Sequence, residues 1–212
     1  MLKMVIVSIL GLILFGALPV ARAAEKHLIY MQGCCVQQAN GAVARDYKTI
    51  VQTLRDAGFN VFFELRTADE TDKEGQAQAY AEKVAQYVQG LLAKGVAPED
   101  ITVSGFSLGS RTALVAAGLI AQPRVNYVLL AGCPVNANSR VTIDYTKVTG
   151  RILSIYDSLD DKFGSCEGLL PKEIAFKEIK LESGKGHKLF RLSDEASIAS
   201  WKIPLEQWAK NP

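Results

Sequence analysis

The sequence predicts a three-layer α/β/α sandwich whose central sheet is mostly parallel and has about six strands. Short runs rich in β-branched and aromatic residues alternate with longer segments in which apolar residues recur every three or four positions. The short runs are apolar on nearly every residue, which is typical of strands covered by helices on both faces. No Pro/Ser-rich linker or repeat interrupts residues 24–212, so we expect one domain there.

The expected strands follow from the short apolar runs. They are residues 27–31, 61–65, 101–104, 125–131, 152–156 and 175–181. The expected helices follow from the segments with helical spacing. They are residues 46–57, 76–94, 108–121 and 203–210. The first helix is expected to end at Gly58, and the last to carry Pro204 in its first turn.

Three long segments without a regular pattern each follow an expected strand. They are residues 32–45, 132–150 and 157–172. Because parallel strands all end at the same edge of a sheet, these segments should lie together. Ligands bind at that edge in open α/β sheets.

Residues 1–23 have the pattern of a signal peptide. A positive start is followed by an apolar run over residues 4–18 and by the small-residue site Ala21-Arg22-Ala23. The run is shorter than the roughly 20 residues that a membrane-spanning helix needs, although an uncleaved anchor is the alternative. The sequence therefore predicts a periplasmic or secreted chain of residues 24–212, with no membrane contact after cleavage.

The charge balance gives no reason to expect a nucleic-acid partner. The chain has 24 basic and 22 acidic residues, and the predicted signal peptide contains the basic residues Lys3 and Arg22. The remaining chain is close to neutral and has no basic cluster. Two histidines and no repeated C-x-x-C spacing also argue against a metal site, so neither metal nor cofactor is expected. The oligomeric state is left open.

Four cysteines remain after the predicted signal peptide, in a compartment expected to be oxidising. They are Cys34, Cys35, Cys133 and Cys166. One or two disulfides are plausible, and four cysteines allow three pairings. A Cys133–Cys166 bond would join two of the long segments, whereas free or buried thiols are the alternative.

The segment Gly105–Gly109 reads G-x-S-x-G between an expected strand and an apolar helix. This is where a nucleophile elbow lies, with a strained serine whose neighbouring glycines avoid collisions with the strand and helix. The elbow would expose the hydroxyl of Ser107 beside a helix N-terminus that stabilises negative charge. The alternative is a glycine-rich turn that happens to contain a serine.

A serine hydroxyl becomes a good nucleophile only when a base removes its proton, and His187 is the only histidine that follows Ser107. It lies after the last expected strand, so it should reach the same edge of the sheet. An acid that orients the imidazole should follow the strand at 152–156. We favour Asp160, with Asp161 and then Asp157 as alternatives.

The order Ser, Asp, His on this pattern of strands resembles a small α/β-hydrolase without the first two strands of the larger family pattern. The resemblance covers residues 25–210. It implies an oxyanion hole made by the amide of Leu108 and by that of Gly33 or Cys34. The common His-Gly pair of the family reads Gln32-Gly33 here, which leaves the second donor open. The family often inserts a lid where this chain has only residues 132–150, so we expect an open site.

These residues predict a serine hydrolase that cleaves a carboxylic ester or related acyl bond of a small molecule. Esterases, thioesterases, lipases and peptidases share this machinery. A non-catalytic binding protein that retains the α/β-hydrolase fold is the alternative from another class. Hydrolysis with Cys34 or Cys35 as the nucleophile is a third possibility, although neither cysteine lies at a strand-to-helix elbow.

Overall fold

The computed structural model describes residues 24–34, 36, 40–67, 75–135 and 141–211. The predicted signal peptide, residues 1–23, lies outside this part of the chain, as does Cys35. Within the described ranges, none of the helices is both long enough and apolar enough to cross a bilayer.

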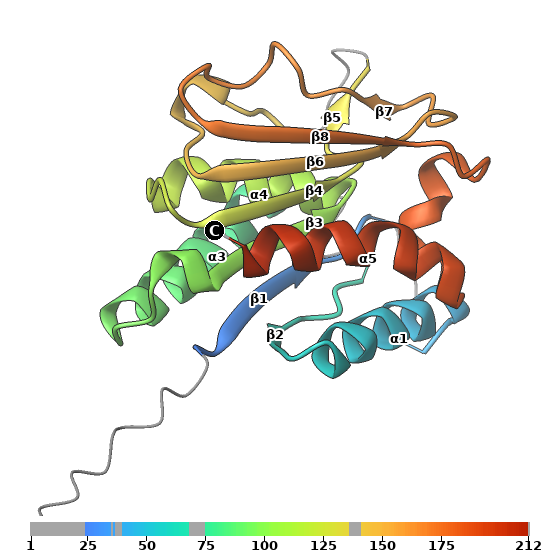
Figure 1. Cartoon of the computed structure of the whole chain (residues 1–212), viewed down its shortest axis with the longest axis horizontal. Helices are drawn as coiled ribbons and strands as arrows, with labels where there is room; N and C mark the ends of the chain where they lie inside the picture. The colour runs from blue at the N-terminus through green and yellow to red at the C-terminus, as the bar shows by residue number, and fades with distance from the viewer. Residues whose placement is uncertain (1–23, 35, 37–39, 68–74, 136–140, 212) are drawn as a thin grey trace, which may run out of the picture.

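The described residues form a six-stranded sheet in the order β2-β1-β3-β4-β6-β8, and every neighbouring pair is parallel. The strands are β1 (Lys26–Met31), β2 (Phe59–Phe62), β3 (Ile101–Phe106), β4 (Asn126–Leu130), β6 (Arg151–Asp157) and β8 (Ala175–Leu181). Figure 1 shows them fanned from β8 at the top to β2 at the bottom. The predicted strands are therefore confirmed within a few residues at each end.

Helices cover both faces of this sheet. They are α1 (Ala42–Asp56), α3 (Gln76–Ala93), α4 (Leu108–Ile120) and α5 (Glu195–Lys210). Buried side chains of α1 and α5 pack with one set of strand residues, and those of α3 and α4 pack with the alternate set. Because successive strand residues point to opposite faces, the two helix pairs lie on opposite sides. The predicted three-layer α/β/α class is confirmed.

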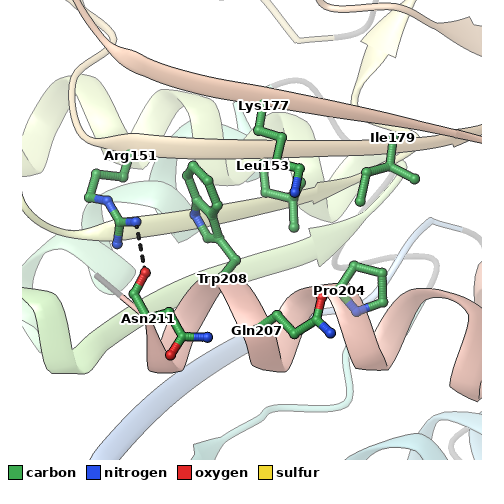
Figure 2. Close-up of a pocket in the computed structure, with 8 residues that line it drawn as sticks. All are labelled: Arg151, Leu153, Lys177, Ile179, Pro204, Gln207, Trp208 and Asn211. Atoms are coloured by element: carbon green, nitrogen blue, oxygen red, sulfur yellow. Dashed lines mark hydrogen bonds between the residues drawn. The ribbon is translucent and has the colours of Figure 1, made fainter.

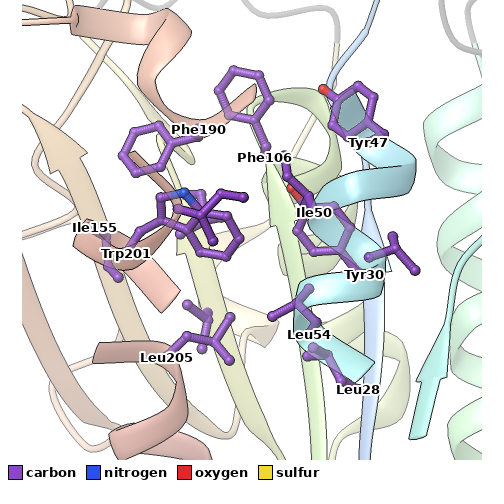
Figure 3. Close-up of a cluster of buried hydrophobic side chains, with 14 of the residues drawn as sticks. Leu28, Tyr30, Tyr47, Ile50, Leu54, Phe106, Ile155, Phe190, Trp201 and Leu205 are labelled. Carbon is purple, nitrogen blue, oxygen red and sulfur yellow. The ribbon is translucent and has the colours of Figure 1, made fainter. Parts of the chain in front are cut away.

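The core on the α1 and α5 face is centred on Trp201, which is fully buried (Figure 3). Its indole stacks on the ring of Tyr30 from β1, with ring centroids 6.4 Å apart. The same cluster includes Phe190 and Phe106, whose ring centroids are 5.9 Å apart. Phe106 directly precedes Ser107, so this core continues up to the predicted nucleophile.

The last helix differs from its prediction, because α5 begins at Glu195 and contains Pro204 in its interior. The side chain of Asp194 accepts a hydrogen bond from the amide of Ser197 at 3.0 Å and so caps the true N-terminus. The proline costs one backbone hydrogen bond, and the buried side chains of Trp201 and Leu205 on either side hold the helix against the core.

Two short strands were not predicted. β5 (Cys133–Pro134) and β7 (Phe163–Gly164) pair antiparallel and form a small ribbon at the end of the sheet, here called the β5–β7 ribbon. A disulfide joins Cys133 to Cys166 beside it, which confirms one of the pairings that the sequence left open. The ribbon therefore ties the segment after β4 to the segment after β6.

Candidate active site

Ser107 lies at the sharp turn between β3 and α4. Its backbone has φ +54° and ψ −113°, in a region that non-glycine residues rarely adopt. A Cβ atom at Gly105 would overlap the backbone of Gly109, and one at Gly109 would overlap the carbonyl of Met31. The two glycines therefore let strand, turn and helix approach closely enough to hold Ser107 in this conformation.

The imidazole of His187 lies between Ser107 and Asp160. Its Nε2 atom is 3.0 Å from Ser107 Oγ, and its Nδ1 atom is 2.7 Å from Asp160 Oδ2. His187 belongs to the short helix η3 (Gly186–Arg191), which follows β8, and Asp160 follows β6. The topology thus brings together three residues that are up to 80 positions apart in the sequence.

Among the three candidate acids, Asp160 is the one that contacts His187. Its second oxygen, Oδ1, accepts hydrogen bonds from the amides of Lys162 and Phe163, both at 3.0 Å. These bonds hold the carboxylate in one orientation, and the Asp160 side chain is fully buried. Asp161 is exposed, and Asp157 is buried with other partners.

Two aromatic rings lie on either side of the His187 imidazole. The ring of Phe106 is 4.8 Å from it between centroids, and that of Phe163 on the β5–β7 ribbon is 4.9 Å away and nearly parallel. Because Phe163 also donates its amide to Asp160, one residue touches two members of the cluster. The rings limit rotation of the imidazole and keep its ring nitrogens aimed at Ser107 and Asp160.

The backbone amides predicted to hold the oxyanion differ in their hydrogen-bond partners. Leu108 is the first residue of α4, so the helix itself provides no acceptor for its amide. The amide of Gly33 donates to the hydroxyl of Tyr47 at 3.0 Å, and a side chain at Gly33 would collide with the ring of Phe106. Burial raises the pKa of Tyr47 to about 12, so this hydroxyl stays neutral. Cys34 follows directly and is disulfide-bonded.

The disulfide at Cys34 also bears on the cysteine alternative, because a nucleophile must be a free thiolate. Cys35 lies outside the described residues. The residue before Gly33 has a structural role, since the side-chain amide of Gln32 pairs with the backbone of Arg66 in both directions, at 2.5 and 3.1 Å. Gln32 therefore anchors the loop that follows β1.

Comparison with known proteins adds information at the level of the fold. No protein-family model matches the chain, and no match is found among curated proteins. A sugar hydrolase from Lactococcus lactis is similar in structure, with a TM-score of 0.60 at 13% identity, covering 88% of this chain and 89% of that one. This chain has the α/β-hydrolase fold.

Two further structures are similar over a comparable share of this chain. Esterase PE8 aligns with a TM-score of 0.52 at 15% identity, covering 87% of this chain and 93% of that one. A carboxylesterase from Mesorhizobium loti aligns with a TM-score of 0.51 at 15% identity, covering 88% and 89%. At these identities the likeness shows the fold alone.

Four residues at this site were missed by sequence reasoning or given no part in it. Tyr47 acts through one long-range hydrogen bond and Gln32 through two, and such bonds leave no local pattern in a sequence. Phe163 belongs to a strand of two residues, too short for a period to be seen. The sequence indicated Asp157 as the least favoured of the three acids and, from its position at a strand end, as a residue that could cap the turn.

A groove of about 370 Å³ lies away from Ser107, between α5 and strands β6 and β8 (Figure 2). Leu153, Ile179, Pro204 and Trp208 give it apolar walls, and the guanidinium of Arg151 lies over the indole of Trp208. Its other lining residues are Lys177, Gln207 and Asn211. These lining residues include no serine, cysteine, histidine or carboxylate, so the groove lacks the combination of groups found at Ser107.

Proposed function

We propose that this chain is a serine hydrolase that cleaves a carboxylic ester or related acyl bond, with Ser107 as nucleophile, His187 as general base and Asp160 as its orienting acid. The observation that carries the proposal is the line of contacts from Ser107 Oγ to His187 Nε2 at 3.0 Å and from His187 Nδ1 to Asp160 at 2.7 Å. Both distances are within hydrogen-bond reach, as nucleophilic catalysis by a serine requires.

In the first half-reaction, Ser107 Oγ attacks the substrate carbonyl carbon and His187 Nε2 takes the hydroxyl proton. The carbonyl oxygen becomes an oxyanion as the tetrahedral intermediate forms. The bond to the leaving alcohol then breaks, and His187 gives that alcohol its proton. Asp160 stabilises the imidazolium in between, because its carboxylate accepts the Nδ1 hydrogen bond.

The amide of Leu108 and that of Gly33 or Cys34 are the donors we propose for the oxyanion. Leu108 lies at the N-terminus of α4, where the helix dipole favours negative charge. The Gly33 amide donates to the Tyr47 hydroxyl at 3.0 Å, so it serves the oxyanion only if that bond is exchanged. In the second half-reaction, His187 removes a proton from water as the water oxygen attacks the acyl carbon. The bond from that carbon to Ser107 Oγ then breaks, and His187 returns the proton to Oγ as the acid leaves.

Two further points support an ester substrate and an oxidising compartment. The similar structures include an esterase and a carboxylesterase, whose names describe their own substrates. The Cys133–Cys166 disulfide fits the periplasm or the exterior, where we propose that the chain works after removal of residues 1–23.

A panel of p-nitrophenyl esters from acetate to decanoate tests the proposal. We expect hydrolysis of the short-chain esters by the unsubstituted chain, because the proposed site is open, and none above background by Ser107→Ala. Equal hydrolysis by both proteins would place the activity elsewhere. An inactive but folded unsubstituted chain would favour a binding protein that retains the fold.

A further inference from the structure

Asp157, the last residue of β6, is buried and accepts four hydrogen bonds. Its Oδ1 atom accepts from the amides of Leu159 at 3.0 Å and Gly186 at 3.1 Å. Its Oδ2 atom accepts from the amide of Ser183 at 2.9 Å and from the Ser183 hydroxyl at 2.5 Å. The four hydrogen-bond donors to this carboxylate therefore lie on two segments of the chain, the one after β6 and the one after β8.

These donors lie directly beside the residues of the proposed triad. Leu159 precedes Asp160, and Gly186 precedes His187. One carboxylate thus holds the backbone next to the acid and the backbone next to the base. Asp157 itself has no contact with His187 or Ser107 among its hydrogen bonds in the described part of the chain.

We propose that Asp157 is a positioning residue that fixes the spacing between Asp160 and His187; this inference rests on the proposed function. Other contacts also join the two segments, namely the Asp160–His187 contact, the stacking of Phe163 on His187, and the hydrogen bond from the Ser158 amide to the Leu181 carbonyl at 2.7 Å. The contacts of Asp157 differ from these, because they bind the backbone next to both Asp160 and His187. The charge on the imidazole changes during each turnover, so the strength of its contact with Asp160 changes as well. A second carboxylate that takes no part in the proton transfer holds the two segments at constant strength.

The local structure fits this role. Gly186 has φ +58°, and a Cβ atom there would lie 2.9 Å from the carbonyl oxygen of Leu159, so the two segments are in direct contact. The Ser183 hydroxyl also accepts a hydrogen bond from the amide of Lys185 at 3.1 Å, which extends the network along the segment that carries His187. Any displacement of Asp157 therefore reaches both segments.

The four hydrogen bonds that Asp157 accepts also favour the ionised form of its carboxyl group. Burial raises the pKa of its carboxyl, but hydrogen bonds from Ser183, Leu159 and Gly186 outweigh burial and leave the pKa below its ordinary value. Asp157 is therefore ionised throughout the pH range in which an imidazole base works, and its contribution to stability is lost only as the pH falls below the usual carboxyl range.

The test compares Asp157→Ala with Asn126→Ala. Asn126 is a matched control, because it is a fully buried residue at the opposite edge of the sheet and its amide donates to the backbone of Glu99 at 2.9 Å. With p-nitrophenyl acetate, we expect Asp157→Ala to lower kcat on the order of 10²-fold with KM unchanged, because misplacement by about 1 Å has that cost. Asn126→Ala should lower Tm but leave kcat unchanged.

A readout independent of turnover is the proton on His187 Nδ1. The 2.7 Å contact with Asp160 predicts a far-downfield resonance that disappears in His187→Ala. Asp157→Ala should broaden or remove this resonance and speed hydrogen exchange at the amides of Leu159 and Gly186. Retention of the resonance and of the exchange rates in Asp157→Ala would overturn the inference.

If Asp157→Ala fails to fold, Ser183→Ala replaces it, since that variant removes only the hydroxyl donor and should lower kcat about fivefold. Equal kcat values in Ser183→Ala and Asn126→Ala would then count against the role. An unsubstituted chain that has the downfield resonance but neither hydrolyses the ester nor reacts with a fluorophosphonate would contradict the proposed function. In that case the resonance and exchange comparisons would still decide whether Asp157 joins the two segments.

Discussion

The two histidines of this chain lie at opposite edges of one sheet, and their surroundings differ. His27 is at the start of β1, where it is nearly buried and its Nδ1 atom has no hydrogen-bond partner among the described residues. His187 follows β8 and has a hydroxyl on one ring nitrogen and a carboxylate on the other. The same side chain is thus packed at one edge and placed for proton transfer at the other.

The difference follows from the direction of the strands. At the edge where β1 begins, chain segments enter the sheet, and the polar contacts near His27 are structural, such as the Lys26–Asp100 ion pair. At the other edge, the segments after β3, β6 and β8 all leave the sheet, with β4 between β3 and β6, and each contributes one residue to the cluster. The geometry of the proposed triad therefore depends on how segments of different strands are held together there.

The largest effect is expected from replacing one histidine and not the other. His187→Gln should lower kcat for p-nitrophenyl acetate about 10⁶-fold, because the proposed base is lost. His27→Gln should leave kcat unchanged, whatever its effect on Tm. Comparable losses of kcat in both variants would contradict the assignment of His187, and not His27, as the base.

A smaller loss is expected at the acid. Asp160→Asn should lower kcat about 10⁴-fold, because an amide favours the wrong imidazole tautomer. Asp161→Asn changes the neighbouring, exposed residue and should leave kcat unchanged. The kinetics of both variants on the same ester decide between the two carboxyl groups, and a larger loss in Asp161→Asn would reverse their assignment.

Phe163 should have a moderate effect. Phe163→Ala removes the ring that stacks on His187 but keeps the amide that donates to Asp160, so we expect kcat to fall roughly tenfold. Phe163→Tyr retains the stacked ring and should have nearly the original kcat. Equal rates in the alanine and tyrosine variants would show that the stacking does not orient the imidazole.

The smallest effect on turnover is expected from the disulfide. Replacing Cys133 and Cys166 together with serine should lower the free energy of unfolding by about 3–4 kcal/mol, since the bond closes a loop with a sequence separation of 33. Well below Tm, kcat should fall less than in Phe163→Ala, because the pairing of β5 with β7 keeps the ribbon in place. Urea unfolding and ester hydrolysis measure the two effects separately.

Most of the fold could be predicted because its main strands and helices have clear local patterns. The six strands are short, mostly apolar runs, α1 and α3 have apolar residues at helical spacing, and α4 is apolar along most of its length. The start of α5 could not be predicted in the same way. Proline is common in the first turn of a helix, so Pro204 predicted that the helix begins near residue 203. The helix in fact begins at Glu195 and is capped by Asp194. The two-residue strands β5 and β7 are formed by long-range pairing alone.

The candidate site was predictable where residues follow from strand order and less so where they follow from loop conformation. Ser107, His187 and Asp160 were each expected at the end of a strand, and the structure brings their side chains together. The choice between Gly33 and Cys34 depends on Tyr47, 14 positions from Gly33 in the sequence. The hydrogen bonds of Asp157 depend on how the segment after β8 folds back toward β6. No local pattern in the sequence predicts that loop conformation.

The most direct test of the central claim is covalent labelling of Ser107. The folded chain is incubated with a fluorophosphonate near neutral pH, digested, and analysed by mass spectrometry to locate the adduct. We predict one adduct on Ser107 that is absent from Ser107→Ala and formed far more slowly in His187→Gln. An unlabelled Ser107 in correctly folded protein, or labelling at the same rate after His187→Gln, would contradict the account.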